Sequence, residues 1–408
     1  MTSSRNLRLG YLVSHPIQYQ APLLRRISTE PDIDLHVFFG SDLSVRSYKD
    51  EGFGANVEWD VPLLEGYSSE FLPSVRDKRR ISVASPVNRG IYDRLHGRGG
   101  APAIDVLWVH GYATVNAMHG MIAARALGIP VLLRAESWLK DRERSGVKLV
   151  AKQAFFRGLR QMVDAVLPIG SLNSAYWSYY LGDEMPQFLM PYAVDNDYFQ
   201  ARSRAAVASR EALARELELQ LGRPVILFAS KLQTRKRCDD LLEATRRLAT
   251  QLSPDRQPYL LIVGDGEERS NLERKVAEAG TTNIRFCGFR NQSELPRFFD
   301  LCDVFVLPSR HEPWGLIVNE VMNAGRAVIV SDDVGSQPDL ITDGIEGCVF
   351  PVGDVDALTA ALLRVLAEPG TAAAMGARAR ERISRWGFEE DMLGLRAALE
   401  HVGRRLRA

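Results

Sequence analysis

The 408-residue chain has little cysteine and no long apolar run. Its four cysteines form no CxxC pair and lie in apolar segments, so we expect reduced core thiols rather than disulfides or a zinc site. No run approaches the roughly 18 apolar residues that a membrane helix needs. The first apolar run stops at Ser14-His15-Pro16, which is too short for a signal peptide. We therefore expect a cytoplasmic protein.

An excess of either charge is also lacking, since the chain has 51 Lys plus Arg and 51 Asp plus Glu. A net attraction to nucleic acid is therefore not implied, and we expect no nucleic-acid partner. Hydrophobic residues make up 46% and charged residues 25%, which is typical of a globular protein long enough for two domains. One basic stretch has two possible interpretations, which are peripheral contact with the inner membrane face and a solvated helix face. It comprises Lys140, Arg142, Arg144, Lys148, Lys152, Arg157 and Arg160.

Several catalytic signatures are missing. The chain has no G-x-S-x-G elbow, no H-E-x-x-H pair and no Walker A loop. A G-x-G-x-x-G fingerprint is absent from the first strand–helix turn, where Ser14-His-Pro-Ile-Gln18 stands instead, and this argues against a nicotinamide dehydrogenase. Gly264-Asp265-Gly266 is not an Asp-x-Asp metal motif, and the sequence shows no other convincing cluster of metal ligands, so we expect no metal ion.

Short apolar runs alternate with helical patterns along most of the chain. This alternation predicts two Rossmann-like α/β domains with parallel sheets, whose ligands bind at the carboxyl ends of the strands. The expected strands are residues 7–13, 34–39, 106–109, 131–134, 165–169, 188–190, 225–229, 259–263, 284–287, 304–307 and 327–330. The expected helices are residues 114–127, 147–162, 204–219, 238–252, 267–279, 293–301 and 388–406.

The domain boundaries follow from this pattern. We expect a first domain at residues 1–200, a second at 201–385 and a final helix at 386–408. A charged helix after residue 204 separates the two alternations. Apolar residues recur at roughly helical spacing in the last segment and suit a docking face: Met392, Leu393, Leu395, Leu399 and Val402.

Two carboxylates, Glu312 and Glu320, flank Gly315 after the apolar run at 304–307. We expect Glu312 on a loop and Glu320 more than one turn inside the next helix. The helix N-terminus between them suits a phosphate, and a carboxylate on each side can accept hydrogen bonds from sugar hydroxyls. The pattern predicts a nucleotide-sugar site. The alternative is a charged loop with a solvated helix glutamate.

Cations and glycines follow the first two strands of the second half. Lys231 and Lys236 are expected to face a cleft, where they would stabilise a leaving diphosphate. The alternative is a solvated basic turn at residues 235–237. Gly264-Asp265-Gly266 predicts a tight turn at which the backbone approaches a ligand.

Polar residues also follow strands of the first half. His15 and His110 each come directly after a strand, at the end where ligands bind, and are candidates for lining a site or for loop positions. Arg134 and Glu136 end another buried strand. Burying two charges without a purpose is costly, so a location in the cleft is favoured.

With these motifs the chain resembles the retaining GT-B glycosyltransferases of family 4. The opening segment 14–19 is similar to that of a bacterial HPIQY-type subgroup. The resemblance implies an α/β GT-B fold in which the two domains face a cleft and the last helix crosses back to the first domain. The matching segments are Ser230-Lys231-Leu232 with Lys236, Gly264-Asp-Gly266, Phe286-Cys-Gly288-Phe289, Glu312-Pro-Trp-Gly315-Leu316 with Glu320, and Gly325–Asp332.

The resemblance also implies a reaction and residue roles. A sugar would pass from a nucleoside-diphosphate donor on the second domain to a hydroxyl acceptor on the first, without metal or cofactor. The acceptor would be a glycan, a lipid-linked sugar or a small molecule. The implied catalytic residues are His110 near the transferred sugar, Lys231 and Lys236 on the diphosphate, and Glu312 on the donor sugar. Further donor contacts are implied at Gly264, Asp265, Phe289, Arg290, Trp314, Gly315, Leu316, Ile317 and Glu320, the last on the ribose. Acceptor contacts are expected at His15, Arg134 and Glu136.

Some positions depart from the family pattern. Lys231 replaces the usual Arg, Arg237 a usual Gly, Trp314 the commoner Phe and Ala193 a linker Gly. Two other interpretations stay open: a GT-B sugar-nucleotide epimerase, which converts the donor alone, and a non-catalytic two-lobed sugar-binding or scaffold protein.

Overall fold

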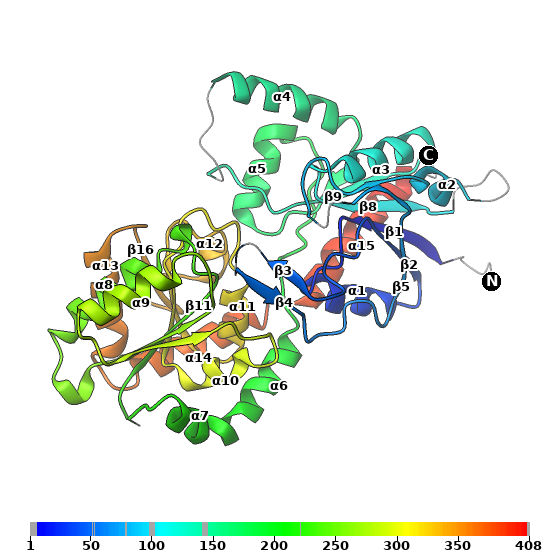
Figure 1. The fold of residues 1–408 in the computed structure, drawn as a ribbon. Coiled ribbons are helices and arrows are strands. Elements are labelled where there is room, and N and C mark those ends of the chain that lie inside the picture. Colours follow the sequence, from blue (N-terminus) through cyan, green and yellow to red (C-terminus); the bar gives the residue numbers. More distant parts are fainter. Residues whose placement is uncertain are drawn as a thin grey trace. The chain divides into compact units, whose positions relative to one another are not determined.

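The computed structural model describes residues 6–50, 52, 54–77, 80–97, 103–140, 146–220 and 222–405. The basic residues Arg142 and Arg144 lie outside this part of the chain. The chain divides into two compact units (Figure 1). Unit 1 comprises Met1–Ser47, Val61–Tyr192 and Phe388–Ala408, and unit 2 comprises Tyr48–Asp60 and Ala193–Gly387. The chain thus passes from unit 1 to unit 2 after Tyr192, earlier than the predicted boundary at residue 200.

Unit 1 is built on a parallel six-stranded sheet in the order β10-β9-β8-β1-β2-β5. Read from β5 and numbered along the chain, this is the 3-2-1-4-5-6 order of a doubly wound sheet, which reverses between β1 and β8. Its strands are β1 (Leu7–Val13), β2 (Ile33–Phe39), β5 (Ser68–Phe71), β8 (Val106–His110), β9 (Val131–Arg134) and β10 (Ala165–Val166). A separate antiparallel pair joins β6 (Ser74–Arg76) to β7 (Val87–Asn88).

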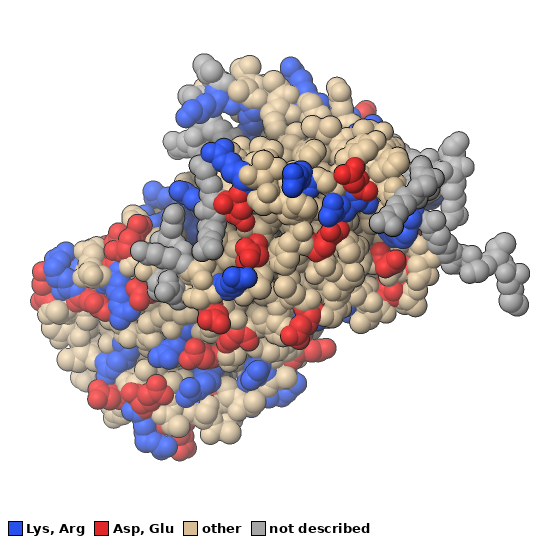
Figure 2. Space-filling model, turned by 45° about the vertical axis from the view of Figure 1, so that its right-hand side comes forward, with Lys and Arg blue, Asp and Glu red and all other residues tan. Residues whose placement is uncertain are grey.

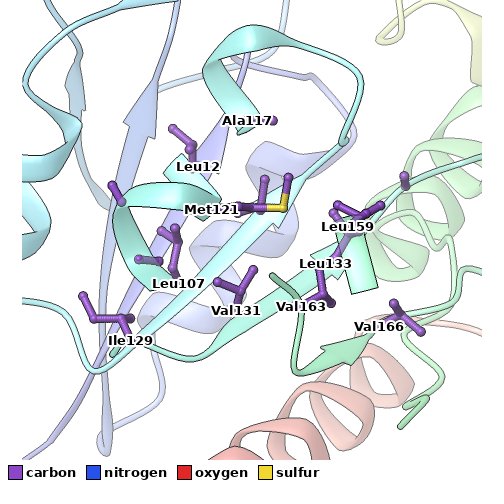
Figure 3. Close-up of a cluster of buried hydrophobic side chains, with 14 of the residues drawn as sticks. Leu12, Leu107, Ala117, Met121, Ile129, Val131, Leu133, Leu159, Val163 and Val166 are labelled. Atoms are coloured by element: carbon purple, nitrogen blue, oxygen red, sulfur yellow. The ribbon is translucent and has the colours of Figure 1, made fainter. Parts of the chain in front are cut away.

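Helices cover both faces of the sheet in unit 1. Leu12 joins the cluster beside helix α3 with Met121 and Val131 (Figure 3), whereas its neighbour Tyr11 packs into the opposite cluster with α1 and α15. Successive side chains of a strand point to opposite faces, so one strand supplies both cores. The helices are α1 (Gln20–Ser28), α2 (Ile91–His96), α3 (Val115–Ala126), α4 (Gly146–Arg160), α5 (Ser171–Leu181) and α15 (Phe388–Arg405).

The last helix, α15, belongs to unit 1, although residues 193–387 before it belong to unit 2. Met392, Leu395, Leu399 and Val402 are buried in the core beside α1, as their spacing predicts. Leu393 is 69% exposed, so its place in the predicted docking face is wrong. It lies one position from Met392, on a different side of the helix.

Unit 2 repeats the same topology in a second parallel sheet, β13-β12-β11-β14-β15-β16, which reverses between β11 and β14. Its strands are β11 (Val225–Ala229), β12 (Tyr259–Val263), β13 (Ile284–Gly288), β14 (Val304–Leu307), β15 (Ala327–Ser331) and β16 (Gly347–Phe350), with an antiparallel pair β3 (Tyr48–Asp50) and β4 (Ala55–Val57). Its helices are α6 (Asn196–Ala206), α7 (Arg210–Glu216), α8 (Cys238–Ala249), α9 (Arg269–Glu278), α10 (Leu295–Leu301), α11 (Ile317–Asn323), α12 (Gln337–Leu340), α13 (Val355–Leu366) and α14 (Thr371–Ile383). Three short 3-10 helices span Val207–Ser209, Thr234–Lys236 and Pro254–Arg256.

A few predicted elements differ from the structure. The strand predicted at 188–190 is wrong, because residues 188–190 form no strand. Gln187 makes an isolated bridge to Val166, and the Phe188 and Met190 N–H groups donate to the Val166 and Pro168 carbonyls. The single helix predicted at 204–219 is divided between α6 and α7 by a 3-10 turn. The strands β5 and β16 were not predicted, because β5 is a polar edge strand and β16 is short and begins with glycine.

Candidate functional site

In unit 2 the candidate residues gather where the strand order reverses. The loop after β11 carries Lys231 and Lys236, and the loop after β14 carries Glu312. Since β11 and β14 are neighbouring parallel strands, both loops leave the same edge of the sheet. The topology therefore brings together the residues that the sequence analysis selected.

Lys236 and Glu312 form a buried ion pair at this edge, with exposed fractions of 7% and 8%. Arg235 adds a second cation, its Nη1 lying 3.4 Å from Glu312 Oε2. Burial lowers the pKa of Lys236, and the charges of Arg235 and Lys231 lower it further, while Glu312 acts in the opposite direction. Two cations therefore contact the Glu312 carboxylate, and Lys231 lies near enough to influence Lys236. This gathering of cations favours a bound anion.

The loop that carries Glu312 is held in place by backbone hydrogen bonds. The Glu312 N–H donates to the Asp333 carbonyl at 3.1 Å, and the Gly335 N–H donates to the Glu312 carbonyl at 2.8 Å. The Arg310 N–H donates to the Arg235 carbonyl at 2.7 Å, which joins this loop to the one bearing the lysines. The carboxylate is thus positioned by the scaffold before any ligand binds.

Glu320 lies in the first turn of α11, so the prediction that it sits more than one turn inside the helix is wrong. Its side chain is buried, and among the described residues its Oε2 has no hydrogen-bond partner. Burial raises the pKa of Glu320 to about 8. A buried acceptor without a partner suits the hydroxyl groups of a ribose.

The backbone at Gly315, Leu316 and Ile317 begins α11, where N–H groups lack intrahelical acceptors and suit a phosphate. Gly315 has φ +86°, and a Cβ there would lie 2.9 Å from Leu307 Cδ2. Trp314 differs from the expectation. Its indole is 3% exposed, stacks on Trp386 with ring centroids 5.6 Å apart and leaves only the backbone for a donor contact.

The glycines of the Gly264-Asp265-Gly266 turn approach protein rather than open space. A Cβ on Gly264 would lie 1.9 Å from the Ser230 carbonyl oxygen, and one on Gly266 would lie 2.5 Å from that of Leu232. The Leu232 N–H donates to the Asp265 carbonyl at 2.8 Å. We therefore revise the expected ligand approach: these glycines bring the β12 loop against the loop that carries Lys231.

Three further candidates carry local contacts within unit 2. Asp265 accepts from Arg269, the first residue of α9, at 2.7 Å. Arg290 donates to the Cys287 carbonyl at 3.1 Å and lies 3.3 Å from Glu294. Phe289 and Arg290 are half-buried at the end of the edge strand β13. The prediction that they flank the base stays a prediction.

Sequence reasoning missed Asp50, which contacts Lys231 within unit 2. Its Oδ1 and Oδ2 lie 2.8 and 3.0 Å from Lys231 Nζ. The two residues are 181 positions apart, and Asp50 falls in a connection that the sequence analysis left without structure. No local pattern signals such a contact.

In unit 1 the two candidate histidines also lie at the switch point, His15 after β1 and His110 at the end of β8. Burial, together with the nearby His110, lowers the pKa of His15 to about 4, and its Nδ1 lies 2.8 Å from Ser14 Oγ. His110 Nε2 lies 3.7 Å from Glu136 Oε1, and its buried Nδ1 has no partner among the described residues. The topology thus brings His110 and Glu136 together.

Glu136 is oriented by Tyr192, a residue that sequence reasoning missed. The Tyr192 hydroxyl donates to Glu136 Oε1 at 2.5 Å. Burial alone would raise the pKa of Glu136, but the interactions with His110 and Tyr192 hold it below its usual value. Glu136 is therefore a carboxylate with two polar partners.

Arg134 requires a correction, because it has no exposed surface to offer an acceptor. Its Nη2 donates to the Pro191 carbonyl at 2.7 Å and lies 3.4 Å from Asp391 Oδ1 on α15. Burial raises the pKa of Asp391 to about 8, and the charge of Arg134 opposes this rise. We interpret Arg134 as a structural residue that fixes α15 and the segment ahead of Tyr192.

The described residues contain no group of three or more His, Cys, Asp or Glu side chains arranged to hold a metal ion. Within the same residues, no helix is long and apolar enough to cross a membrane. On the face shown in Figure 2, basic and acidic side chains are interspersed.

Residues 209–382 match the family model described as "Glycosyl transferases group 1". Two similar proteins are a GDP-mannose-dependent phosphatidylinositol monomannoside mannosyltransferase of Mycolicibacterium smegmatis and a 2-deoxystreptamine glucosyltransferase of Streptomyces kanamyceticus. Each is 34% identical, over 47% and 44% of this chain and over 50% and 45% of the relatives. The chain thus spans about half the length of the curated relatives it matches.

Solved structures resemble the whole chain. The Anabaena HepE protein, solved in complex with UDP, superposes with a TM-score of 0.70 at 16% identity, covering 98% of this chain and all of HepE. A sucrose-phosphate synthase from Thermosynechococcus elongatus superposes with a TM-score of 0.67 at 18% identity, covering 99% of this chain and all of the synthase. The predicted fold class is confirmed: the α/β chain has the GT-B fold, with two Rossmann-like units.

Proposed function

We propose that this chain, whose residues 209–382 match the model of the glycosyl transferases group 1, is a retaining glycosyltransferase that uses a nucleoside-diphosphate sugar without a metal ion. The observation that carries the proposal is the convergence of Lys231, Lys236 and Glu312 at the switch point of unit 2. On the helix that follows, Glu320 Oε2 is buried and has no hydrogen-bond partner among the described residues. These groups match the three parts of such a donor. They supply cations for a diphosphate and carboxylates for sugar and ribose hydroxyls.

The chemistry that these residues support is stabilisation of a leaving group. As the bond between the anomeric carbon and the phosphate oxygen breaks, negative charge grows on the diphosphate. Lys231, Lys236 and the N–H groups at the start of α11 are placed to receive that charge. The acceptor oxygen forms the new bond to the anomeric carbon, and the departing phosphate takes the acceptor proton. No side-chain nucleophile is required, and Glu312 binds hydroxyls.

The acceptor side of the proposal rests on unit 1. His15, His110 and Glu136 lie at or after the carboxyl ends of neighbouring strands, and Glu136 accepts a hydrogen bond from Tyr192. A carboxylate and imidazoles suit the binding and orientation of a hydroxyl acceptor, which is a large source of rate enhancement. The acceptor is a glycan, a lipid-linked sugar or a small molecule.

The relatives indicate which donors to test first. One is GDP-mannose-dependent by name, and HepE has also been solved with UDP-glucose. We propose UDP-glucose and GDP-mannose as the first donors of a wider panel. Their bases differ, so the panel also reports on the loop at Phe289.

The test is donor binding by calorimetry with the wild type, Lys236→Ala and Glu320→Ala. The first variant removes a phosphate cation and the second removes the ribose acceptor, so each is expected to weaken binding at least about tenfold. Glu267→Gln, an exposed position outside the proposed contacts, is the control. If both variants bind and turn over the cognate donor like the wild type, the site assignment fails.

Two alternatives predict different products. An epimerase converts the nucleotide sugar into its epimer without an acceptor and without net release of nucleoside diphosphate. A non-catalytic binding protein binds the donor and changes nothing. Product analysis by NMR with and without added acceptor separates all three.

Peripheral membrane contact is a second proposal, supported by α4. The described part of this helix carries Lys148, Lys152, Arg157 and Arg160, and its sequence contains no acidic residue. Val150 is 66% and Phe155 38% exposed. A basic helix with exposed apolar side chains suits an anionic lipid surface, whereas a solvated face is the alternative. Co-sedimentation with anionic but not neutral vesicles is expected, and equal sedimentation with both contradicts the proposal.

A further inference from the structure

The segment Tyr48–Asp60, which we call the strap, belongs to unit 2 although the residues on either side belong to unit 1. Its two short strands β3 and β4 pair antiparallel, with Tyr48 opposite Val57. Two contacts of the strap with the rest of unit 2 bear on the proposed donor site. One is at Lys231, and the other directly follows Phe289 and Arg290.

The first contact is the ion pair between Asp50 and Lys231. Both carboxylate oxygens lie within 3.0 Å of Nζ, and the side chain of Asp50 is 13% exposed. The Gly52 N–H also donates to Asp50 Oδ1 at 2.8 Å, which fixes the carboxylate. A Cβ on Gly52 would lie 2.7 Å from Lys231 Cδ, so the strap backbone packs directly on the lysine.

The second contact lies at the other end of the strap. Asn291 Nδ2 donates to the Glu58 carbonyl at 2.8 Å, and the Ser293 N–H donates to Asp60 Oδ2 at 3.2 Å. Asn291 directly follows Phe289 and Arg290, which the proposed function places beside the base. The strap therefore reaches from the diphosphate lysine to the base loop.

We propose that the Asp50 carboxylate occupies, in the ligand-free protein, the position at Lys231 that a donor phosphate takes on binding, so that the strap competes with the donor. This inference rests on the proposed function. A carboxylate and a phosphate are both anionic acceptors for an ammonium group. Two anions beside one lysine repel each other, so the phosphate must displace Asp50 from the ammonium.

Asp50 is therefore expected to lower the affinity of the protein for the donor. Asp50→Asn keeps the size of the side chain and an oxygen for the Gly52 N–H, but it removes the competing charge. UDP or GDP, whichever the wild type binds, is expected to bind Asp50→Asn about tenfold more tightly. The gain is expected to shrink as salt is added, because the competition is electrostatic.

Calorimetric titration with UDP and with GDP tests this inference. Asp42→Asn removes the same charge at an exposed position in unit 1 and is expected to leave the dissociation constant unchanged. Lys231→Ala is expected to weaken binding, and Asp50→Asn is expected to give no gain when added to Lys231→Ala. Matched thermal unfolding curves show that the variants are folded.

Two outcomes contradict the inference in different ways. If Lys231→Ala weakens binding but Asp50→Asn binds like the wild type or more weakly, Asp50 supports the lysine rather than competing, and the inference alone fails. If the wild type binds neither nucleotide nor any donor of the panel, the proposed function fails and the inference falls with it.

Discussion

Replacing Glu320 by Gln is predicted to stabilise the ligand-free protein increasingly as the pH rises. Burial raises the pKa of Glu320 from 4.5 to about 8. The folded state therefore holds a proton that the unfolded state releases between these two values, and stability is lost as the pH rises through this window. The difference in pKa corresponds to a loss of about 5 kcal/mol at pH values above the folded pKa.

A glutamine is neutral throughout, so it removes this loss. Relative to the wild type, the free energy of unfolding of Glu320→Gln is expected to rise by about 4 kcal/mol between about pH 5 and about pH 9. Other titrating groups are common to both proteins and cancel in the comparison. Above the folded pKa of about 8, where the wild-type side chain is a carboxylate, the same variant is expected to bind UDP or GDP more weakly, because an amide offers ribose hydroxyls one acceptor oxygen instead of two.

Urea denaturation of both proteins at the two pH values measures this difference. Glu267→Gln, an exposed glutamate of unit 2, is the matched control and is expected to show no such pH dependence. If the stability difference between wild type and Glu320→Gln is the same at both pH values, the carboxylate is not buried as described. The role that follows from its burial then fails as well.

Three further stability predictions follow from the geometry, each measured by chemical denaturation. Arg237 has φ +51°, so Arg237→Gly is expected to be about 1 kcal/mol more stable than Arg237→Ala, and equal stabilities would contradict the strain. Gly264→Ala places a Cβ 1.9 Å from the Ser230 carbonyl oxygen and is expected to cost more than about 3 kcal/mol. The open Gly280→Ala is expected to cost about 1 kcal/mol, and similar costs would refute the close approach. Arg134→Met leaves Asp391 buried without its cation and is expected to cost about 3–5 kcal/mol, whereas adding Asp391→Leu should recover part of this loss.

Much of the fold was predictable because local sequence patterns indicate its strands and helices. The central strands β11 and β14 are continuous apolar runs, and β1 is interrupted only by Arg8 near its start. Such runs predict buried parallel strands. Histidines and lysines directly after strands could be assigned to the ligand-binding edge by the general rule for such sheets. Among the strands that were missed, β5 and β16 lie at sheet edges. The apolar signal of β5 is weak because the strand is polar and partly exposed, and that of β16 is weak because the strand is short and begins with glycine.

The residues that were misjudged depend on contacts far apart in the sequence. Arg134 was predicted to line a site because charged residues at the ends of strands often do so. Its partner Asp391 is 257 positions away in the sequence. Trp314 stacks on Trp386, a pairing that only the folded chain reveals. The turn glycines were misjudged for the same reason, because only the three-dimensional structure shows which backbone lies opposite them.

The claim that this chain transfers sugars with retention is tested most directly by NMR analysis of donor turnover, beginning with UDP-glucose and GDP-mannose. At least one donor is expected to be consumed, and the sugar is expected to appear first, on water or on an added acceptor, with the anomeric configuration it had in the donor. Release of nucleoside diphosphate should accompany it. An inverted product, an epimerised donor or no consumption across the whole panel would contradict the account.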